Sequence, residues 1–225
     1  MKVVGVVPIR YQDCCRADGS PAATLDGRPV WAHTLDQAVA ARSLDRVIVA
    51  HDDDRFLAHL APWADRVQTL YRPETLSRPG VTTLDVLAFV AEHLADAEPD
   101  YLMLLEITHP LRPPGVIDQV VATLEGQPAD ALVTCRPVHY TFWRQNEHGV
   151  VQRIAGAGDR AQVRMYQELI GIGSLFRPAV LRAGDPFGGR VDMVPIDRFW
   201  ATVDVRDADG LWLAERCLER EIDRH

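Results

Sequence analysis

The hydrophobic and polar positions of this chain alternate between short apolar runs and longer amphipathic segments. The short runs are rich in β-branched residues and end at polar residues, which is typical of strands. They predict strands over residues 3–8, 46–50, 66–70, 101–105 and 131–135. Between them, apolar residues recur at helical spacing and predict helices over 30–41, 53–61, 82–94 and 115–124. This alternation predicts a three-layer α/β fold, with a mostly parallel sheet flanked by helices.

The alternation of predicted strands and helices changes after Arg136. Two apolar stretches, 140–143 and 150–154, are separated by polar turn residues and predict a hairpin, which a loop rich in Gly, Ala and Arg follows. We expect this small excursion, residues 137–165, to leave the sheet and expose aromatic side chains, which suits a dimer contact. The alternative is that Tyr140, Phe142 and Trp143 cover the sheet.

The parallel pattern resumes in the last quarter of the chain. It predicts strands over 169–176, 191–195 and 200–205, and a helix over 208–219. No internal repeat and no second domain boundary stands out, so residues 1–225 are expected to form a single domain.

Composition and charge narrow the class of protein. The chain has 225 residues, a formal net charge of −8 and no run of Lys or Arg, which argues against a nucleic-acid-binding protein. Its apolar runs fall well short of the ~20 residues that a membrane helix needs, and we see no secretory signal pattern. Cys14, Cys15, Cys135 and Cys217 lack metal-ligand spacing, as do the histidines. We therefore expect a cytoplasmic protein with no nucleic-acid and no membrane partner.

The loop after the first predicted strand is the first candidate for a binding site. It runs from Arg10 to Gly27 at the carboxyl end of a strand, where parallel sheets bind their ligands. Arg10, Arg16, Gly19 and Ser20 offer guanidinium groups, backbone N–H groups and a hydroxyl to a triphosphate. The loop has neither the Walker pattern nor GxGxxG, so neither a P-loop kinase nor a Rossmann dehydrogenase is supported. The alternative is a plain surface loop.

Several segments, in sequence order, resemble one family. They are Val6–Arg10 (Val-Val-Pro-Ile-Arg), Asp26–Val30 (Asp-Gly-Arg-Pro-Val), Asp45–Asp53, Arg72–Leu76 followed by Thr82–Leu87, and Leu104–Arg112 (Leu-Leu-Glu-Ile-Thr-His-Pro-Leu-Arg). Together they resemble the cytidylyltransferases that activate acidic sugars, namely the CMP-N-acylneuraminate (CMP-sialic acid) synthetases and the related CMP-3-deoxy-octulosonate synthetases.

This resemblance covers nearly the whole chain and implies a nucleotide-diphospho-sugar transferase-like fold. It implies a transferase that moves CMP from CTP to an acidic sugar, such as a 2-keto-3-deoxy sugar acid, and releases pyrophosphate. It also implies Mg²⁺ as cofactor and a homodimer. In such a reaction the enzyme works mainly by positioning the reactants and neutralising phosphate charge.

The resemblance also assigns roles to individual residues. The expected assignments are Arg10 and Arg16 on the phosphates, Arg72 and Thr82 in the nucleotide pocket, Glu106, Arg112, Tyr166 and Glu168 on the acceptor side, and Asp204 on Mg²⁺ with Asp207 as a second ligand. Of these, Arg10, Arg16 and Asp204 are the catalytic candidates. Structural alternatives exist: Arg112 tying down its own loop, Asp85 pairing near the start of its helix, and Asp52 and Asp53 acting as helix-start carboxylates.

The departures from the family pattern fall where the chemistry is expected. The phosphate loop has no glycine before Gly19, and Lys2 is the only lysine in the chain. Arg206 stands where the family has its second metal aspartate, and Glu106 stands where it has a glutamine. A carboxylate there repels an acidic acceptor unless it is protonated or paired. Two rival hypotheses follow: a catalytically silent relative that binds a ligand or an active partner, and a nucleotidyltransferase that uses another base.

Overall fold

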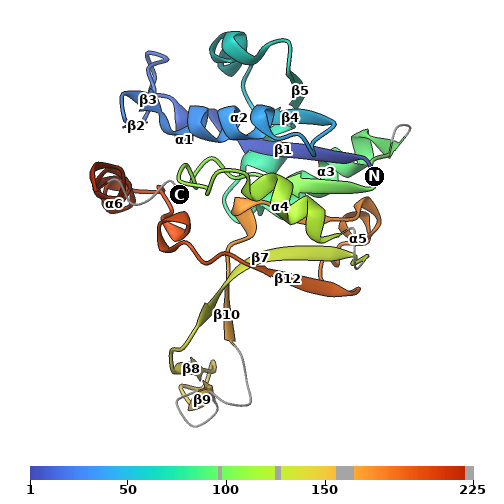
Figure 1. Ribbon diagram of the computed structural model, residues 1–225, viewed down its shortest axis with the longest axis vertical. Helices are drawn as coiled ribbons and strands as arrows, with labels where there is room; N and C mark the ends of the chain where they lie inside the picture. The colour runs from blue at the N-terminus through green and yellow to red at the C-terminus, as the bar shows by residue number, and fades with distance from the viewer. Residues whose placement is uncertain (96–97, 125–127, 156–164, 221–225) are drawn as a thin grey trace.

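The computed structural model describes residues 1–95, 98–124, 128–155 and 165–220. Its centre is a sheet of order β10-β7-β11-β6-β1-β4-β5, with β12 also paired to β7 (Figure 1). The strands are β1 (Val3–Ile9), β4 (Arg46–His51), β5 (Val67–Tyr71), β6 (Tyr101–Leu104), β7 (Ala131–Val138), β10 (Met165–Glu168), β11 (Ser174–Phe176) and β12 (Val191–Pro195). The pairs β1–β4, β1–β6, β4–β5 and β7–β12 are parallel, as the strand–helix alternation predicted.

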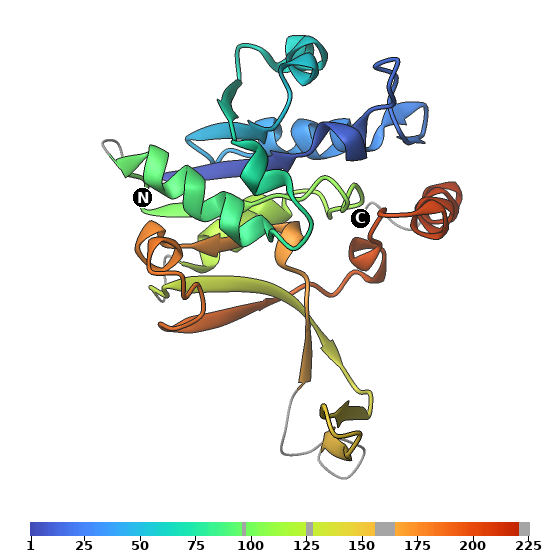
Figure 2. The same ribbon diagram turned by 180° about the vertical axis from the view of Figure 1, so that it is seen from behind.

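Helices cover both faces of this sheet. α2 (Val30–Ala40) and α4 (Val116–Thr123) lie on the face turned to the viewer in Figure 1, and α3 (Thr83–His93) and α5 (Pro178–Arg182) lie on the face seen in Figure 2. Side chains of β1 alternate between the two layers: Val7 and Ile9 join the cluster with α2 and α4, whereas Val4 and Val6 join the one with α3 and α5. The three-layer arrangement is therefore confirmed.

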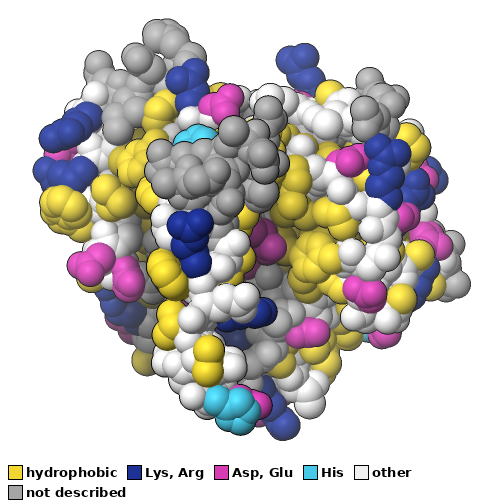
Figure 3. Space-filling model, turned by 90° about the horizontal axis from the view of Figure 1, so that it is seen from below, with side chains coloured by type: hydrophobic (Ala, Val, Ile, Leu, Met, Phe, Trp, Pro, Cys, Tyr) yellow, Lys and Arg dark blue, Asp and Glu magenta, His cyan; other side chains and the backbone are white. Residues whose placement is uncertain are grey.

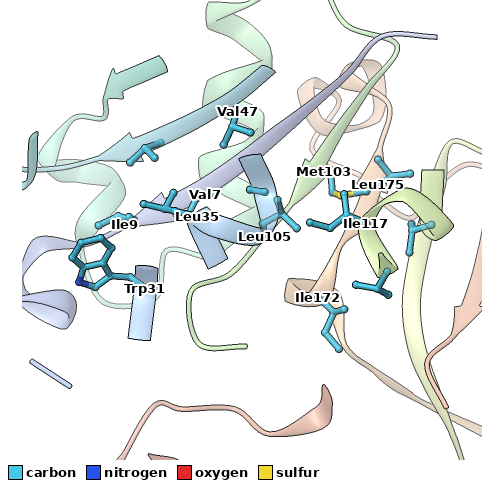
Figure 4. Close-up of a cluster of buried hydrophobic side chains, with 14 of the residues drawn as sticks. Val7, Ile9, Trp31, Leu35, Val47, Met103, Leu105, Ile117, Ile172 and Leu175 are labelled. Carbon is cyan, nitrogen blue, oxygen red and sulfur yellow. The ribbon is translucent and has the colours of Figure 1, made fainter. Parts of the chain in front are cut away.

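The larger core lies between β1, β6 and the helices α2 and α4. Figure 4 shows Val7, Ile9, Trp31 and Leu35 on one side of it and Ile117 on the other. Full burial of such an aliphatic side chain stabilises the fold by about 1.5–3 kcal/mol. This packing holds the carboxyl ends of β1 and β6 side by side, and the loops that follow them form the site described below.

The remaining described elements are mostly short. They are α1 (Tyr11–Cys14), β2 (Thr24–Leu25), β3 (Arg28–Pro29), η1 (Asp54–Trp63), η2 (Glu74–Ser77), η5 (Ile170–Ile172), η6 (Phe199–Thr202) and α6 (Ala208–Glu219). η1 is a 3₁₀ helix, with Pro62 inside it, in the place of the helix expected over 53–61. The closing helix α6 agrees with its predicted range.

Two of the predicted strands differ from the structure: one is shortened, and the other is not formed by the described residues. The apolar run 169–176 divides into η5 and β11, and β11 runs antiparallel to both β6 and β7. Gly171 and Gly173 interrupt this run, so the chain turns there and re-enters the sheet in the opposite direction. The run 200–205 contains η6, and Val203 and Val205 pack in a cluster with α6 instead of joining the sheet. In both places the side chains are buried as expected, but by other elements.

The predicted hairpin is present. β8 (Phe142–Gln145) pairs antiparallel with β9 (Val151–Ala155), and both project away from the body of the molecule (Figure 1). Tyr140 and Trp143 are 66% and 62% exposed, so the alternative that they cover the sheet is wrong. Seen from the hairpin end, hydrophobic side chains lie at the surface beside charged ones (Figure 3). The loop expected after the hairpin, residues 156–164, lies outside the described residues.

Candidate functional site

A cavity of about 470 Å³ lies at the carboxyl ends of the parallel strands β1, β5 and β6, beside the start of α3. Its walls are formed by Pro8, Arg10, Asp13, Arg72, Leu76, Pro79, Gly80, Val81, Thr82, Thr83, Val86, Glu106, Ile107, Thr108 and Arg206. Ligand cavities commonly measure ~300–1,000 Å³ and lie at this edge of an α/β sheet. Of the sequence-predicted residues, the fold brings Arg10, Arg72, Thr82 and Glu106 to this one cavity.

Arg10 and Arg72 supply positive charge from the carboxyl ends of β1 and β5, between which β4 lies in the sheet. Arg10 follows β1, and its Nη1 lies 3.5 Å from Asp13 Oδ2. Arg72 follows β5; its Nη2 donates to the Ile9 carbonyl at 3.2 Å and lies 3.7 Å from Asp52 Oδ2. Within the described residues, the Nε atoms of both arginines are buried without a hydrogen-bond partner. Both guanidinium groups therefore have donors left for an anionic ligand.

The charge of Arg72 is set by two opposing effects. Burial lowers the pKa of its guanidinium, and the neighbouring Asp52 carboxylate opposes this shift. Asp52 is itself held in place, because it accepts a hydrogen bond from the Tyr11 backbone N–H at 2.8 Å. The expectation that Asp53 is a helix-start carboxylate is confirmed, since its side chain accepts from Arg55 N at the start of η1.

Thr82 starts the helix beside the cavity. Its hydroxyl oxygen accepts from the Asp85 N–H at 3.2 Å, and the Asp85 carboxylate accepts from the Thr82 N–H at 2.7 Å. This reciprocal pair is a capping box, which satisfies two backbone donors at the start of α3. Asp85 is therefore the helix-start carboxylate that the sequence suggested, but its partner is Thr82 and not an arginine.

Arg112 is buried and does not line the cavity. Its side chain is 3% exposed, and every N–H of its guanidinium donates a hydrogen bond. Nε donates to Ile172 O (2.8 Å), and Nη1 donates to Thr34 Oγ1 and His109 O (2.7 Å each). Nη2 donates to Gly171 O (2.6 Å) and Glu106 O. A guanidinium has five N–H donors, and all are used here. The assignment of Arg112 to the acceptor is therefore corrected: it ties loop 106–112 to η5. Burial lowers the pKa of Arg112 to about 9.

Glu106 forms another part of the cavity wall. Its carboxylate lies so close to Gly171 that a Cβ added there would be 2.4 Å from Oε2, so a residue without a side chain is needed at this approach. Arg206 Nη2 donates to Glu106 Oε2 at 3.1 Å, and Arg206 Nε donates to Asp204 Oδ2 at 2.6 Å. Glu106 is thus paired, which removes the repulsion that the sequence raised for an anionic ligand.

Three other predicted residues stand outside the cavity lining. Arg16 donates to the carbonyls of Pro21 and Ala22 at 2.6 and 3.1 Å, so its guanidinium fastens its own loop and is not brought to the cavity. Tyr166 and Glu168 lie on β10, which pairs with β7. Burial, together with the charge of Glu106, raises the pKa of Glu168, so the two carboxylates interact electrostatically.

The residues described here do not fit a magnesium site built by the protein. Among the described residues, no group of three or more His, Cys, Asp or Glu side chains is placed to hold a metal ion. Asp204 Oδ2 is bound by the Arg206 guanidinium, and Oδ1 is buried without a hydrogen-bond partner among the described residues. Asp207 accepts from Gly210 N at 2.8 Å as the N-cap of α6. The expected Asp204–Asp207 pair stays a prediction, and in the structure an arginine engages one carboxylate and a helix end engages the other.

Sequence patterns alone missed several of the lining residues. Asp13 lies at the cavity because α1 folds back beside Arg10, and the loop 79–81 lies there because η2 turns the chain before α3. The sequence alone singles out Arg206, because it stands where the related family has an acidic residue. Its pairing with Glu106, 100 positions away, is visible only in the fold.

No protein-family model matches the chain. Among curated proteins it is similar to 3-deoxy-manno-octulosonate cytidylyltransferases. That of Anaeromyxobacter sp. (strain K) is 35% identical over 124 residues, which cover 55% of this chain and 48% of that protein. That of Geobacter sulfurreducens is 29% identical over 136 residues, which cover 60% and 50%. The chain therefore spans about half the length of the curated relatives it matches.

Solved structures match over almost the whole chain. The 4-diphosphocytidyl-2C-methyl-D-erythritol synthase of Anaerococcus prevotii has a TM-score of 0.69 at 13% identity and covers 97% of this chain and 99% of that one. A CMP:2-keto-3-deoxy-manno-octonic acid synthetase complexed with CTP has a TM-score of 0.67 at 16% identity and covers 99% and 100%. The expected nucleotide-diphospho-sugar transferase-like fold is thus confirmed.

No helix among the described residues is long and apolar enough to cross a membrane.

Proposed function

We propose that this chain is a cytidylyltransferase that transfers CMP from CTP to a 2-keto-3-deoxy sugar acid and releases pyrophosphate. The observation that carries the proposal is a single cavity at the carboxyl edge of the sheet, into which Arg10, Arg72 and Arg206 converge. The names of the similar proteins support CTP as the nucleotide and a 2-keto-3-deoxy sugar acid as the acceptor. A cytoplasmic location, where CTP is available, is part of the proposal.

The chemistry requires positioning more than acid–base catalysis. A hydroxyl oxygen of the acceptor attacks the α-phosphorus in line, the bond to the β-phosphate bridging oxygen breaks, and pyrophosphate leaves while the hydroxyl proton passes to water. Arg10 and Arg72 bind the phosphate oxygens and hold the triphosphate at the strand ends. Arg112 keeps loop 106–112 in place, and the cavity wall thereby keeps its shape. No step is assigned to a magnesium ion held by the protein.

The acceptor is proposed to bind on the Glu106 side of the cavity. The pairing of Glu106 with Arg206 lets an acidic compound approach this wall without meeting an uncompensated carboxylate. Tyr166 and Glu168 remain predicted contacts of the acceptor. The proteins of similar sequence carry the name of the octulosonate branch, which favours a 2-keto-3-deoxy sugar acid over an acylneuraminate.

A pyrophosphate-release assay tests this proposal directly. The purified chain is incubated with CTP, Mg²⁺ and a panel of 2-keto-3-deoxy sugar acids, and CMP-sugar and pyrophosphate are expected in equal amounts. Arg72→Gln is expected to lower kcat/KM for CTP by about 10- to 100-fold, because a charge-assisted hydrogen bond to phosphate is lost. Arg16→Gln is the matched control, since Arg16 does not line the cavity. No turnover with any acid, beside an active control enzyme, contradicts the proposal.

One observation favours a second candidate, a relative that binds nucleotide without turning it over: the carboxylate of Asp204 is held by Arg206. Calorimetry separates the two, because tight CTP binding without pyrophosphate release supports the silent relative. A larger thermal shift with UTP, GTP or ATP than with CTP would instead support the rival with another base.

We further propose that the chain forms a homodimer through the hairpin β8–β9. Tyr140, Trp143, Val150, Val151 and Ile154 are each more than half exposed there, and such exposed apolar surface is typical of a protein contact. Sedimentation at micromolar concentration is expected to give a dimer for the wild type and a monomer for Trp143→Ser. A monomeric wild type contradicts this proposal and leaves the enzymatic one untouched.

A further inference from the structure

An ion cluster at the cavity joins two carboxylates through one arginine; Glu106 and Arg206 line the cavity, whereas Asp204 is not among its lining residues. Arg206 Nε donates to Asp204 at 2.6 Å, and Arg206 Nη2 donates to Glu106 at 3.1 Å. The two carboxylates come from different parts of the chain, Glu106 after β6 and Asp204 after η6. The guanidinium therefore bridges two carboxylates across the site, which is the arrangement that a divalent cation makes in other proteins.

We propose that the Arg206 guanidinium replaces a protein-bound divalent cation in this site, so that the chain binds the nucleoside triphosphate without a metal ion. The proposal rests on the proposed function of the same cavity and concerns how the phosphate charge is neutralised. It differs from the family expectation, in which carboxylates hold Mg²⁺.

The guanidinium is placed to receive an anion. Its side chain is 62% exposed and lines the cavity together with Arg10 and Arg72. Two of its nitrogens bind carboxylates, and within the described part of the chain the third, Nη1, has no hydrogen-bond partner. The bridge to Asp204 and Glu106 orders the side chain before the ligand arrives, which lowers the entropic cost of binding. Arg206 therefore offers an oriented, charged donor to a phosphate oxygen.

A metal ion in the same position meets three obstacles. Mg²⁺ requires an octahedral shell of oxygens at ~2.0–2.1 Å. Both carboxylates already bind the guanidinium through one oxygen each, and Asp204 Oδ1 is buried, with no hydrogen-bond partner among the described residues. A divalent ion would also lie beside a fixed positive charge, and like charges in a partly buried site repel. The carboxylates of Asp204 and Glu106 therefore favour the Arg206 guanidinium over a metal ion.

The remaining charges of the cavity are compatible with a metal-free triphosphate. Arg10 pairs with Asp13 at 3.5 Å and Arg72 with Asp52 at 3.7 Å, and these distances are longer than those of direct hydrogen bonds. Both arginines can therefore direct donors to phosphate oxygens without breaking a short ion pair. With Arg206 they place three guanidinium groups around one ligand.

Calorimetric titration of the full chain with CTP, once in excess EDTA and once in Mg²⁺, tests the proposal. The wild type is expected to bind CTP in EDTA with a Kd within about tenfold of that in Mg²⁺. Arg206→Gln is expected to weaken binding in EDTA by about 10- to 100-fold, which is the loss of one charged hydrogen bond. Arg28→Gln is the matched control, because Arg28 also pairs with an aspartate at the surface but lies away from the cavity.

A metal-binding measurement gives a second readout that is independent of the nucleotide. Mn²⁺, followed by its electron paramagnetic resonance, is expected to remain free in the presence of the wild type. Arg206→Asp removes the guanidinium and adds a carboxylate beside Asp204 and Glu106, so this variant is expected to bind Mn²⁺. Far-UV circular dichroism checks that both variants are folded.

The outcomes are distinct. CTP binding by the wild type only when Mg²⁺ is present overturns the inference and leaves the proposed function standing. Stoichiometric Mn²⁺ binding by the wild type that Asp204→Asn abolishes also overturns it, as does unchanged binding of Arg206→Gln in EDTA. No CTP binding in either buffer refutes both the inference and the proposed function.

Discussion

Arg112 offers the sharpest test of how the site is held together. Its five N–H donors meet four backbone carbonyls and the Thr34 hydroxyl, and the side chain is 3% exposed. A lysine in its place keeps the positive charge but has three donors, so at least two buried acceptors lose their partner. Each buried polar group left unpaired costs about 1–3 kcal/mol, so Arg112→Lys is expected to lower the free energy of unfolding by roughly 2–6 kcal/mol.

Urea unfolding measures this loss. The midpoint is expected to fall steeply with an unchanged slope, because the same surface is exposed on unfolding. Arg16→Lys is the matched control: Arg16 also donates to two backbone carbonyls, but at an exposed position where water replaces the lost bonds, so its cost is expected to stay below about 1 kcal/mol. If Arg112→Lys were as stable as Arg16→Lys, the reasoning that buried carbonyls depend on the guanidinium would be refuted.

Three further predictions concern the same region. Burial and the neighbouring guanidinium groups lower the pKa of His109 from 6.5 to about 4, so its neutral form is favoured in the folded state. The free energy of unfolding should therefore fall as the pH drops from about 6.5 towards 4. His109→Gln should flatten that part of the profile of urea midpoint against pH. Gly171→Ala places a Cβ 2.4 Å from Glu106 Oε2 and should cost about 1–3 kcal/mol, whereas Gly173→Ala, whose nearest neighbour is at 3.6 Å, should cost less; equal midpoints would contradict this. Asp85→Ala removes a capping box and should lower the free energy of unfolding by about 1 kcal/mol, with an unchanged thermal midpoint as the contrary result.

Local hydrophobic periodicity was enough to predict most of the helices and strands in the first part of the chain. Strands β1, β4, β6 and β7 and helices α2, α3 and α4 lie where the pattern predicted them, within a few residues at their ends. This works because burial on both faces requires continuous apolar strands, and burial on one face requires helical spacing. The strand predictions over 169–176 and 200–205 differ from the structure for two reasons. The chain reverses at Gly171 and Gly173, and α6 covers Val203 and Val205.

The sequence by itself determined the α/β class and several of the residues that line the cavity, since these depend on local patterns and on motifs at the ends of strands. Only the tertiary structure decided which charges meet. The sequence predicts Arg16 on the phosphates and Arg112 on the acceptor side, yet in the structure one fastens its own loop and the other is buried and does not line the cavity. Arg206 was read as the loss of a metal ligand, and the fold shows it bridging Asp204 and Glu106. Pairings between residues about a hundred positions apart depend on how loops pack, and local periodicity does not encode that packing.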